Sequence, residues 1–70
     1  MNTLDARGYS CPIPVVMTQK ALDQSRPDCL EVLVDAQAAV QNITRFAAAR
    51  RYRVTVTEQG QDYLLTLRKD

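Results

Sequence analysis

Apolar side chains recur along the first third of the chain with two different periods. Thr3–Ala6 alternates polar and apolar positions and ends at Arg7-Gly8, a turn signal, so it predicts a short strand. From Pro12 to about Gln24 the period becomes helical, and the helix must end before Pro27, which lacks a backbone donor. The residues on the apolar arc of this helix are Pro14, Val15, Thr18, Ala21 and Leu22.

The middle of the chain predicts a covered strand followed by a second helix. Leu30–Val34 is a mostly apolar run, typical of a central strand. Asp35 follows it where a helix N-cap belongs, and the helix is expected to continue through Arg50. Its apolar residues, at i, i+3, i+4 and i+7 spacing, are Ala36, Ala39, Val40, Ile43, Phe46 and Ala47.

The last third of the chain predicts an antiparallel hairpin. Tyr52–Thr57 and Tyr63–Leu67 are strand-like and flank a short glycine-containing turn, Glu58–Asp62. The element order is therefore β-α-β-α-β-β. Because the first crossover is long enough to hold a helix, the first two strands should be parallel. We expect an α/β (α+β) two-layer sandwich, with a four-stranded mixed sheet and both helices on one face.

Length and composition indicate one ordered domain spanning residues 1–70. The apolar share is 46% and the charged share is 24%, values typical of a globular chain. No segment approaches the roughly 18 apolar residues that span a bilayer, and no basic-then-apolar leader is visible. We therefore expect a cytoplasmic protein with no membrane partner. The net charge of +1 is too small to indicate binding to bulk nucleic acid.

The sequence contains no histidine and two cysteines. The absence of histidine removes the usual general base and the commonest transition-metal ligand. Cys11 and Cys29 are too far apart in sequence for a CxxC metal or redox motif. No metal or cofactor is therefore expected, and any cysteine chemistry depends on a single thiol.

One motif could carry such chemistry: residues 10–14 read SCPIP, at the start of the first predicted helix. Two prolines are tolerated there because the N–H groups that they lack belong to the unpaired first turn. The spacing places Cys11 at the helix N-cap or one residue before it. If Cys11 is the N-cap, Pro14 occupies N3, and the Ile13 N–H is the only donor left for the sulfur. This placement is as typical of a reactive thiol as of a small buried side chain.

Arg7, four residues before Cys11, is a second source of positive field. The helix macrodipole contributes only about 0.3–1 kcal/mol at an exposed site, so a thiolate there needs a further positive charge. Asp5 opposes Arg7 unless the two side chains pair or point apart. Two hypotheses follow: Arg7 holds negative charge on the sulfur, or Arg7 pairs with Asp5 and only shapes the turn.

The turn and the cysteine motif together resemble the signature of a known family. Leu4–Gly8 (LDARG) followed by Cys11–Pro14 (CPIP) is similar to the opening of the TusA/SirA family, small sulfur-carrier proteins with a Cys-Pro-x-Pro motif. The resemblance continues through Val34-Asp35, the second helix and the hairpin. The family's fold, similar to the C-terminal domain of translation initiation factor three, agrees with the element order predicted from the residues.

The resemblance implies that Cys11 carries a sulfane sulfur as a persulfide. The chain would receive it from a sulfur donor protein such as a cysteine desulfurase and pass it to a sulfur-acceptor protein, as a sulfurtransferase-type relay rather than a self-contained enzyme. No direct contact with nucleic acid is implied. The supporting residues implied are Asp5, Arg7, Gly8, Pro12, Ile13 and Pro14.

Two other functions remain as hypotheses. Segments Asp35–Asn42, Arg45–Ala47 and Gly60–Leu65 look closest to the YedF-like branch of the family, which is linked to selenium metabolism. A selenium-related or regulatory interaction module would use the same thiol with a different cargo. An RNA-binding module would explain the fold and the arginines near the end of the second helix, but it leaves the cysteine motif without a role.

Several further residues have both a structural and a functional interpretation. Cys29 precedes an apolar strand and is expected to pack at the strand start. Ile13 and Val16 are either exposed for partner docking or packed under a loop. Four arginines near the end of the second helix have two interpretations. Cations at a helix C-terminus are favourable in any protein, and the alternative is a docking patch for an acidic partner. The arginines concerned are Arg45, Arg50, Arg51 and Arg53.

Overall fold

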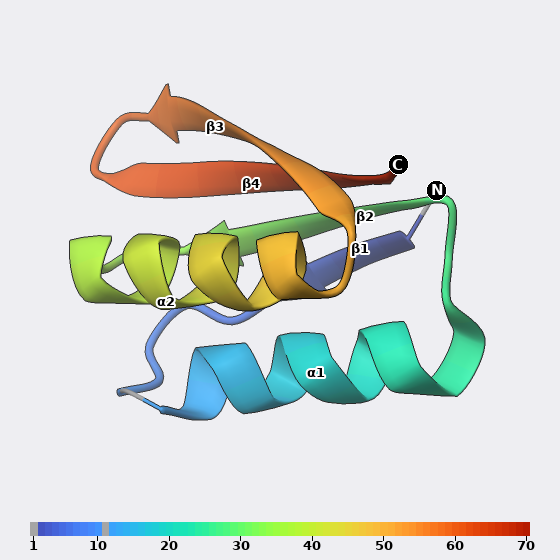
Figure 1. Ribbon diagram of the computed structural model, residues 1–70. Helices are drawn as coiled ribbons and strands as arrows, with labels where there is room; N and C mark the ends of the chain where they lie inside the picture. Colours follow the sequence, from blue (N-terminus) through green and yellow to red (C-terminus); the bar gives the residue numbers. More distant parts are fainter. Residues whose placement is uncertain (1, 11) are drawn as a thin grey trace.

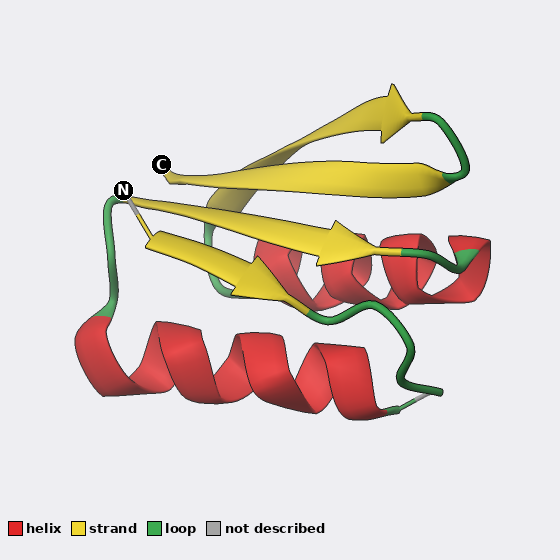
Figure 2. Cartoon of the chain, turned by 180° about the vertical axis from the view of Figure 1, so that it is seen from behind, coloured by secondary structure: helices red, strands yellow, loops and turns green. Residues whose placement is uncertain are grey.

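The computed structural model describes residues 2–10 and 12–70 and arranges them as two layers (Figure 1). Both helices lie against the same face of the sheet, as the view from behind shows (Figure 2). The predicted β-α-β-α-β-β order and two-layer sandwich are therefore confirmed. The elements in chain order are β1 (Asn2–Asp5), α1 (Ile13–Ser25), β2 (Cys29–Val34), α2 (Gln37–Ala49), β3 (Tyr52–Gln59) and β4 (Asp62–Lys69).

The four strands form one mixed sheet in the order β1-β2-β4-β3. β1 and β2 are parallel, and β4 is antiparallel to both β2 and β3. Val34, the last residue of β2, is opposite Tyr63, the second residue of β4. The carboxyl ends of β1 and β2 therefore lie at the same end of the sheet as the β3–β4 turn. We call this the turn end of the sheet (Figure 1).

The hairpin turn is shorter than the apolar pattern predicts. The predicted turn Glu58–Asp62 is wrong, because β3 continues to Gln59 and β4 begins at Asp62. Only two residues connect the strands, and the first of them, Gly60, has a φ of +65°. A two-residue loop with positive φ at its first position matches the right-handed twist of a hairpin. Backbone pairing needs no apolar side chains, so it extends beyond the segment that the pattern marks.

The second helix begins one residue later than predicted and without a side-chain cap. Its N-cap is Ala36, which has extended backbone (φ −133°, ψ 137°). The prediction that Asp35 caps this helix is wrong, because its carboxylate accepts a hydrogen bond from the Gly8 N–H instead (2.9 Å). The Ala36 carbonyl accepts bonds from the N–H groups of Ala39 and Val40 (3.1 and 3.2 Å). Neither α1 nor α2 is long and apolar enough to cross a membrane.

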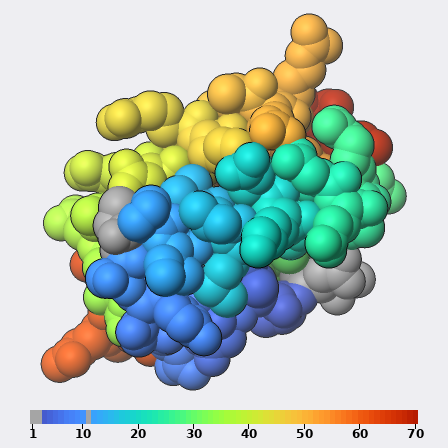
Figure 3. Space-filling view, turned by 90° about the horizontal axis from the view of Figure 1, so that it is seen from below, coloured from blue at the N-terminus to red at the C-terminus, as the bar shows by residue number. Residues whose placement is uncertain are grey.

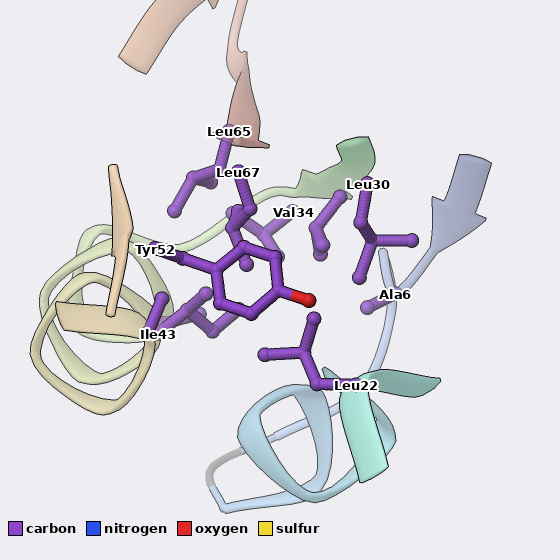
Figure 4. Close-up of a cluster of buried hydrophobic side chains, with 11 residues drawn as sticks. Ala6, Leu22, Leu30, Val34, Ile43, Tyr52, Leu65 and Leu67 are labelled. Atoms are coloured by element: carbon purple, nitrogen blue, oxygen red, sulfur yellow. The ribbon is translucent and has the colours of Figure 1, made fainter. Parts of the chain in front are cut away.

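The core lies between the sheet and the helices, and the predicted apolar arcs face it. Tyr52 and Leu22 approach each other across it, beneath the side chains of β2 and β4 (Figure 4). Ala36 is exposed because it precedes α2. Burying one large apolar side chain, such as that of Leu22, contributes about 1.5–3 kcal/mol to the stability of the folded state. The buried residues are Ala6, Pro14, Thr18, Leu22, Leu30, Val32, Val34, Ala39, Ile43, Ala47, Tyr52, Leu65 and Leu67.

Polar contacts hold the other end of the molecule together. The Tyr52 hydroxyl donates to the Pro27 carbonyl (2.8 Å), which ties β3 to the loop after α1. Arg50 forms an ion pair with Asp23 of α1, and its guanidinium lies 4.8 Å from the centre of the Phe46 ring. Arg50 therefore has a structural role in joining the two helices.

Two threonines of the helices differ in how their hydroxyls are satisfied. Thr18 donates to the Pro14 carbonyl (3.0 Å), whereas the buried Thr44 hydroxyl has no hydrogen-bond partner among the described residues. Because an unpaired buried hydroxyl costs roughly 1–3 kcal/mol, Thr44→Val should raise the free energy of unfolding by about 1 kcal/mol. Thr18→Val is the matched control and should lower it by about 1 kcal/mol. Urea unfolding measures both, and a loss of stability in Thr44→Val would contradict this account.

Candidate functional site

The candidate site is the loop from β1 to α1, at the turn end of the sheet. Arg7, Gly8, Tyr9 and Ser10 are exposed, and so is Pro12 on the far side of the cysteine. Cys11 itself lies outside the described residues. Gly8 has a φ of +83°, a conformation that side chains with a Cβ rarely adopt. The loop therefore turns sharply after β1 and leads along the surface to the helix.

α1 begins at Ile13, one residue after Pro12. Its N-cap is Pro12 and Pro14 is buried at N2, so the alternative that places Cys11 at the N-cap, with Pro14 at N3, is wrong. The Ile13 N–H donates to the Ser10 carbonyl (2.9 Å). That bond closes a turn before the helix, so the Ile13 N–H is not the free donor predicted for the sulfur. The Val16 N–H donates to the Pro12 carbonyl (3.1 Å).

Arg7 is held by two carboxylates. Its Nε and Nη2 donate to the two oxygens of Asp5 (3.0 Å each), and its backbone N–H donates to Asp5 Oδ1 (3.1 Å). Its Nη1 also donates to Asp62 Oδ2 (3.2 Å). The pairing of Arg7 with Asp5 is therefore present, and the Arg7 charge is shared rather than free. Asp62 was missed because it lies 55 residues from Arg7, and only the strand register brings it near.

This pairing shifts both ionisation equilibria. The side-chain hydrogen bond from Arg7 is the main cause that lowers the pKa of Asp5, followed by the backbone hydrogen bond. The hydrogen bonds to Asp5 and then Asp62 raise the pKa of Arg7 above its ordinary value. Both groups are exposed, so solvent screens the pair and its contribution to stability is modest.

A second contact fixes the loop from another strand. The Gly8 N–H donates to Asp35 Oδ2 (2.9 Å), and Asp35 comes directly after β2. The Arg7 side chain reaches the start of β4 and the Gly8 backbone reaches the end of β2. Two neighbouring residues of the loop are thus tied to two different strands, which sets the path of the chain before Cys11.

Large apolar side chains are exposed on either side of Cys11 in the sequence. Tyr9 is 49% exposed, Ile13 is 44% exposed and Val16 is 39% exposed. Of the two alternatives for Ile13 and Val16, exposure is the one observed. The loop and α1 extend across one face of the molecule (Figure 3). Apolar surface of this kind is typical of contact regions.

The remaining candidates take no part in this loop. Cys29 is half-buried as the first residue of β2, where the sequence predicted it. Arg53 pairs with Asp70 (3.5 Å). Within residues 2–10 and 12–70, no three histidine, cysteine, aspartate or glutamate side chains gather where they could hold a metal ion.

The fold and the loop define a small α+β domain whose sequence places a Cys-Pro-x-Pro motif at the start of its first helix. A family profile described as Sulfurtransferase TusA matches residues 2–69. The chain therefore belongs to the TusA family of sulfur carriers.

Individual relatives agree with this assignment. A candidate sulfur carrier protein of Methanocaldococcus jannaschii is 42% identical over 62 residues, 87% of this chain and 83% of its own length. One of Halobacterium salinarum is 36% identical over 63 residues, 87% of this chain and 78% of its own length. The crystal structure of a SirA-like protein from Desulfitobacterium hafniense superposes with a TM-score of 0.89, at 32% identity, over 97% of this chain and 96% of that chain.

The Asp5–Arg7 pair gives a titration test. Because the pKa of Asp5 is lowered in the folded state, the pair stabilises fully above the ordinary carboxyl pKa and is lost as the pH falls through the folded value. Arg7→Ala should raise the pKa of Asp5 and remove that part of the acid dependence. Carboxyl NMR titration measures the shift. Arg53→Ala, which breaks the pair with Asp70, is the control and should leave Asp5 unchanged. An unaltered Asp5 titration in Arg7→Ala would contradict the pairing.

The Gly8–Asp35 bond gives a test of loop anchoring. Asp35→Ala removes the acceptor, so the Gly8 amide should exchange with solvent roughly tenfold faster, which corresponds to a bond worth about 1.4 kcal/mol. Asp35→Asn keeps a weaker acceptor and should give an intermediate rate. Amide exchange by NMR resolves the three proteins. Identical Gly8 rates would show that the loop is held without Asp35.

Proposed function

We propose that the protein is a sulfur relay in which Cys11 holds a persulfide between a sulfur donor, such as a cysteine desulfurase, and a sulfur-acceptor protein. The observation that carries this proposal is the Cys-Pro-Ile-Pro sequence at residues 11–14, within a family match that covers residues 2–69. Ser10 and Pro12 are exposed, which supports the proposal because a segment that exchanges sulfur with another protein must contact that protein. We place this relay in the cytoplasm, where thiols are kept reduced.

The chemistry requires two displacements at sulfur. The Cys11 thiolate attacks the outer sulfur of the donor's persulfide, a new S–S bond forms, and the donor's cysteine leaves as a thiolate. In the second step a thiolate of the acceptor attacks the outer sulfur on Cys11, and Cys11 leaves as a thiolate. Electrons balance in each step because one S–S bond replaces another. Neither metal nor cofactor is needed on this chain.

The neighbouring residues have positioning roles in this proposal. Asp5 and Arg7 set the turn at the loop entry, and Gly8 supplies the positive φ and the bond to Asp35. Pro12 and Pro14 fix the backbone where the loop becomes helix, since a proline ring restricts φ. Ile13 offers exposed apolar surface to a partner.

The partner supplies what the chain lacks. No histidine is present to act as a general base, and Arg7 is already shared by two carboxylates. A persulfide is more acidic than a thiol, so the loaded form needs less help to stay ionised. We therefore propose that a donor or acceptor completes the site, which fits a carrier better than a self-contained enzyme.

A selenium-related role is the second candidate. It rests on the similarity of Asp35–Asn42, Arg45–Ala47 and Gly60–Leu65 to the YedF-like branch. This role would use the same thiol with selenium as the cargo. The mass added to the protein distinguishes the two, because a selenium atom is much heavier than a sulfur atom.

Loading by a desulfurase tests the proposal directly. Protein incubated with cysteine, pyridoxal phosphate and a cysteine desulfurase should gain the mass of one sulfur atom, measured without reductant. Cys11→Ser should abolish the gain, and Cys29→Ser, the matched control at the half-buried cysteine, should keep it. Urea unfolding of both variants shows that each is folded. Sulfur found on Cys29 in the Cys11→Ser variant would overturn the site assignment.

A further inference from the structure

The charges of the chain are divided unevenly between its two ends. Among the described residues, the turn end of the sheet holds one basic side chain, Arg7, and four carboxylates, which gives a formal charge of −3. The rest of the chain holds eight basic and four acidic side chains, a charge of +4. The net charge of +1 therefore conceals an acidic end. The four carboxylates belong to Asp5, Asp35, Glu58 and Asp62.

The strand register places these carboxylates together. Asp5 ends β1, and Asp35 follows Val34 at the end of β2. Asp62 begins β4 and reaches Arg7 (3.2 Å). Glu58 is opposite Tyr63, the residue after Asp62, so it lies at the same end of the sheet. The N-termini of α1 and α2 both lie at this end and add roughly half a positive charge each, together too little to reverse the sign.

Exposed apolar side chains lie beside this acidic group. Tyr9, Ile13 and Val16 belong to the loop and the first turn of α1, and they are three of the four most exposed large apolar residues in the described chain. Tyr9 directly follows Gly8, whose N–H is bonded to Asp35. Apolar surface and carboxylates therefore share the end of the molecule from which the loop leads to Cys11.

We propose that the turn end is a docking surface for a protein whose contact face is cationic around an apolar centre. Protein interfaces bury an apolar centre within a polar rim, and potentials across them are complementary. A nucleic acid would be repelled by four carboxylates. The inference rests on the proposed function, since docking there brings a partner's cysteine to Cys11. A cationic partner also supplies the positive charge that Arg7, shared by two carboxylates, does not offer.

Reactive peptides can probe this surface without a known partner. Each peptide carries one cysteine activated as a thiopyridyl disulfide, and the protein carries Cys29→Ser so that Cys11 is its one thiol. The Cys11 thiolate attacks the peptide sulfur, a protein–peptide disulfide forms, and pyridinethiolate leaves with the electron pair. The first peptide combines lysines with leucine and phenylalanine. The second replaces the lysines with glutamates, and the third replaces the apolar residues with serines.

The cationic apolar peptide should react fastest. At low salt we expect it to exceed the anionic peptide by roughly tenfold, since complementary fields accelerate association by 10-fold or more. Added salt should reduce this ratio, because exposed charges are screened over about 10 Å at 0.1 M. The serine peptide should react more slowly than the apolar one at equal charge.

Charge variants locate the effect on the surface. Asp62→Asn and Glu58→Gln should each lower the cationic-to-anionic rate ratio about two- to threefold, as one of several nearby charges is lost. Asp23→Asn is the matched control, because Asp23 also pairs with an arginine but lies ten residues beyond Ile13 along α1. That distance is about 15 Å, beyond the screening length of about 10 Å at 0.1 M salt, so the variants are compared at that salt concentration. The ratio in Asp23→Asn should match the parent protein.

Three results would contradict the proposed docking surface. Equal rates for the cationic and anionic peptides, a ratio unchanged in Asp62→Asn, or no reaction with any peptide would overturn it. The desulfurase assay is separate, so the two proposals can fail independently. Loss of persulfide loading with an intact peptide ratio refutes the relay, whereas loading without a charge preference refutes only this surface.

Discussion

The parallel pairing of β1 with β2 is the constraint on which the loop depends. It requires a crossover, which α1 supplies, and it brings the carboxyl ends of both strands to one end of the sheet. Asp5 is the last residue of β1, and Arg7 and Gly8 follow it at this end of the sheet. Asp35 follows the last residue of β2 and lies beside them. The antiparallel hairpin then adds Asp62 from the other side. The strand directions thus bring residues from three parts of the chain next to the segment that leads to Cys11.

Much of this fold could be predicted because its information is local. Helical spacing from Ala39 to Ala47 predicts a buried helix face, and the apolar run Leu30–Val34 predicts a covered strand, and both predictions are confirmed. The errors occurred where a polar residue forms a contact that the local pattern does not show. Asp35 has the composition of a helix cap, yet the Gly8 N–H competes for the same carboxylate. The hairpin turn was drawn too long because polar residues such as Glu58 and Gln59 pair through their backbones.

The candidate site divides in the same way. The cysteine and the two prolines of the motif lie within four consecutive residues, so they could be recognised from the sequence. The electrostatics of the site could not, because the field depends on carboxylates at positions 5, 35, 58 and 62 that only the register brings together. The sequence left two hypotheses for Arg7, and its pairing with Asp5 is present in the structure. The register adds a second carboxylate to Arg7, that of Asp62, which lies 55 residues away in sequence.

The bond between Arg7 and Asp62 also bears on how the chain acquires its site during folding. A contact across 55 residues closes a long loop, and its entropic cost delays such contacts until other elements are in place. During synthesis the cysteine motif emerges before Asp62, which lies 51 residues after Cys11. A chain interrupted before β4 would contain the thiol, Asp5 and Asp35, but it would lack the second carboxylate that holds Arg7. The addition of β4 therefore completes the set of carboxylates around Arg7 after the loop and β2 have been made.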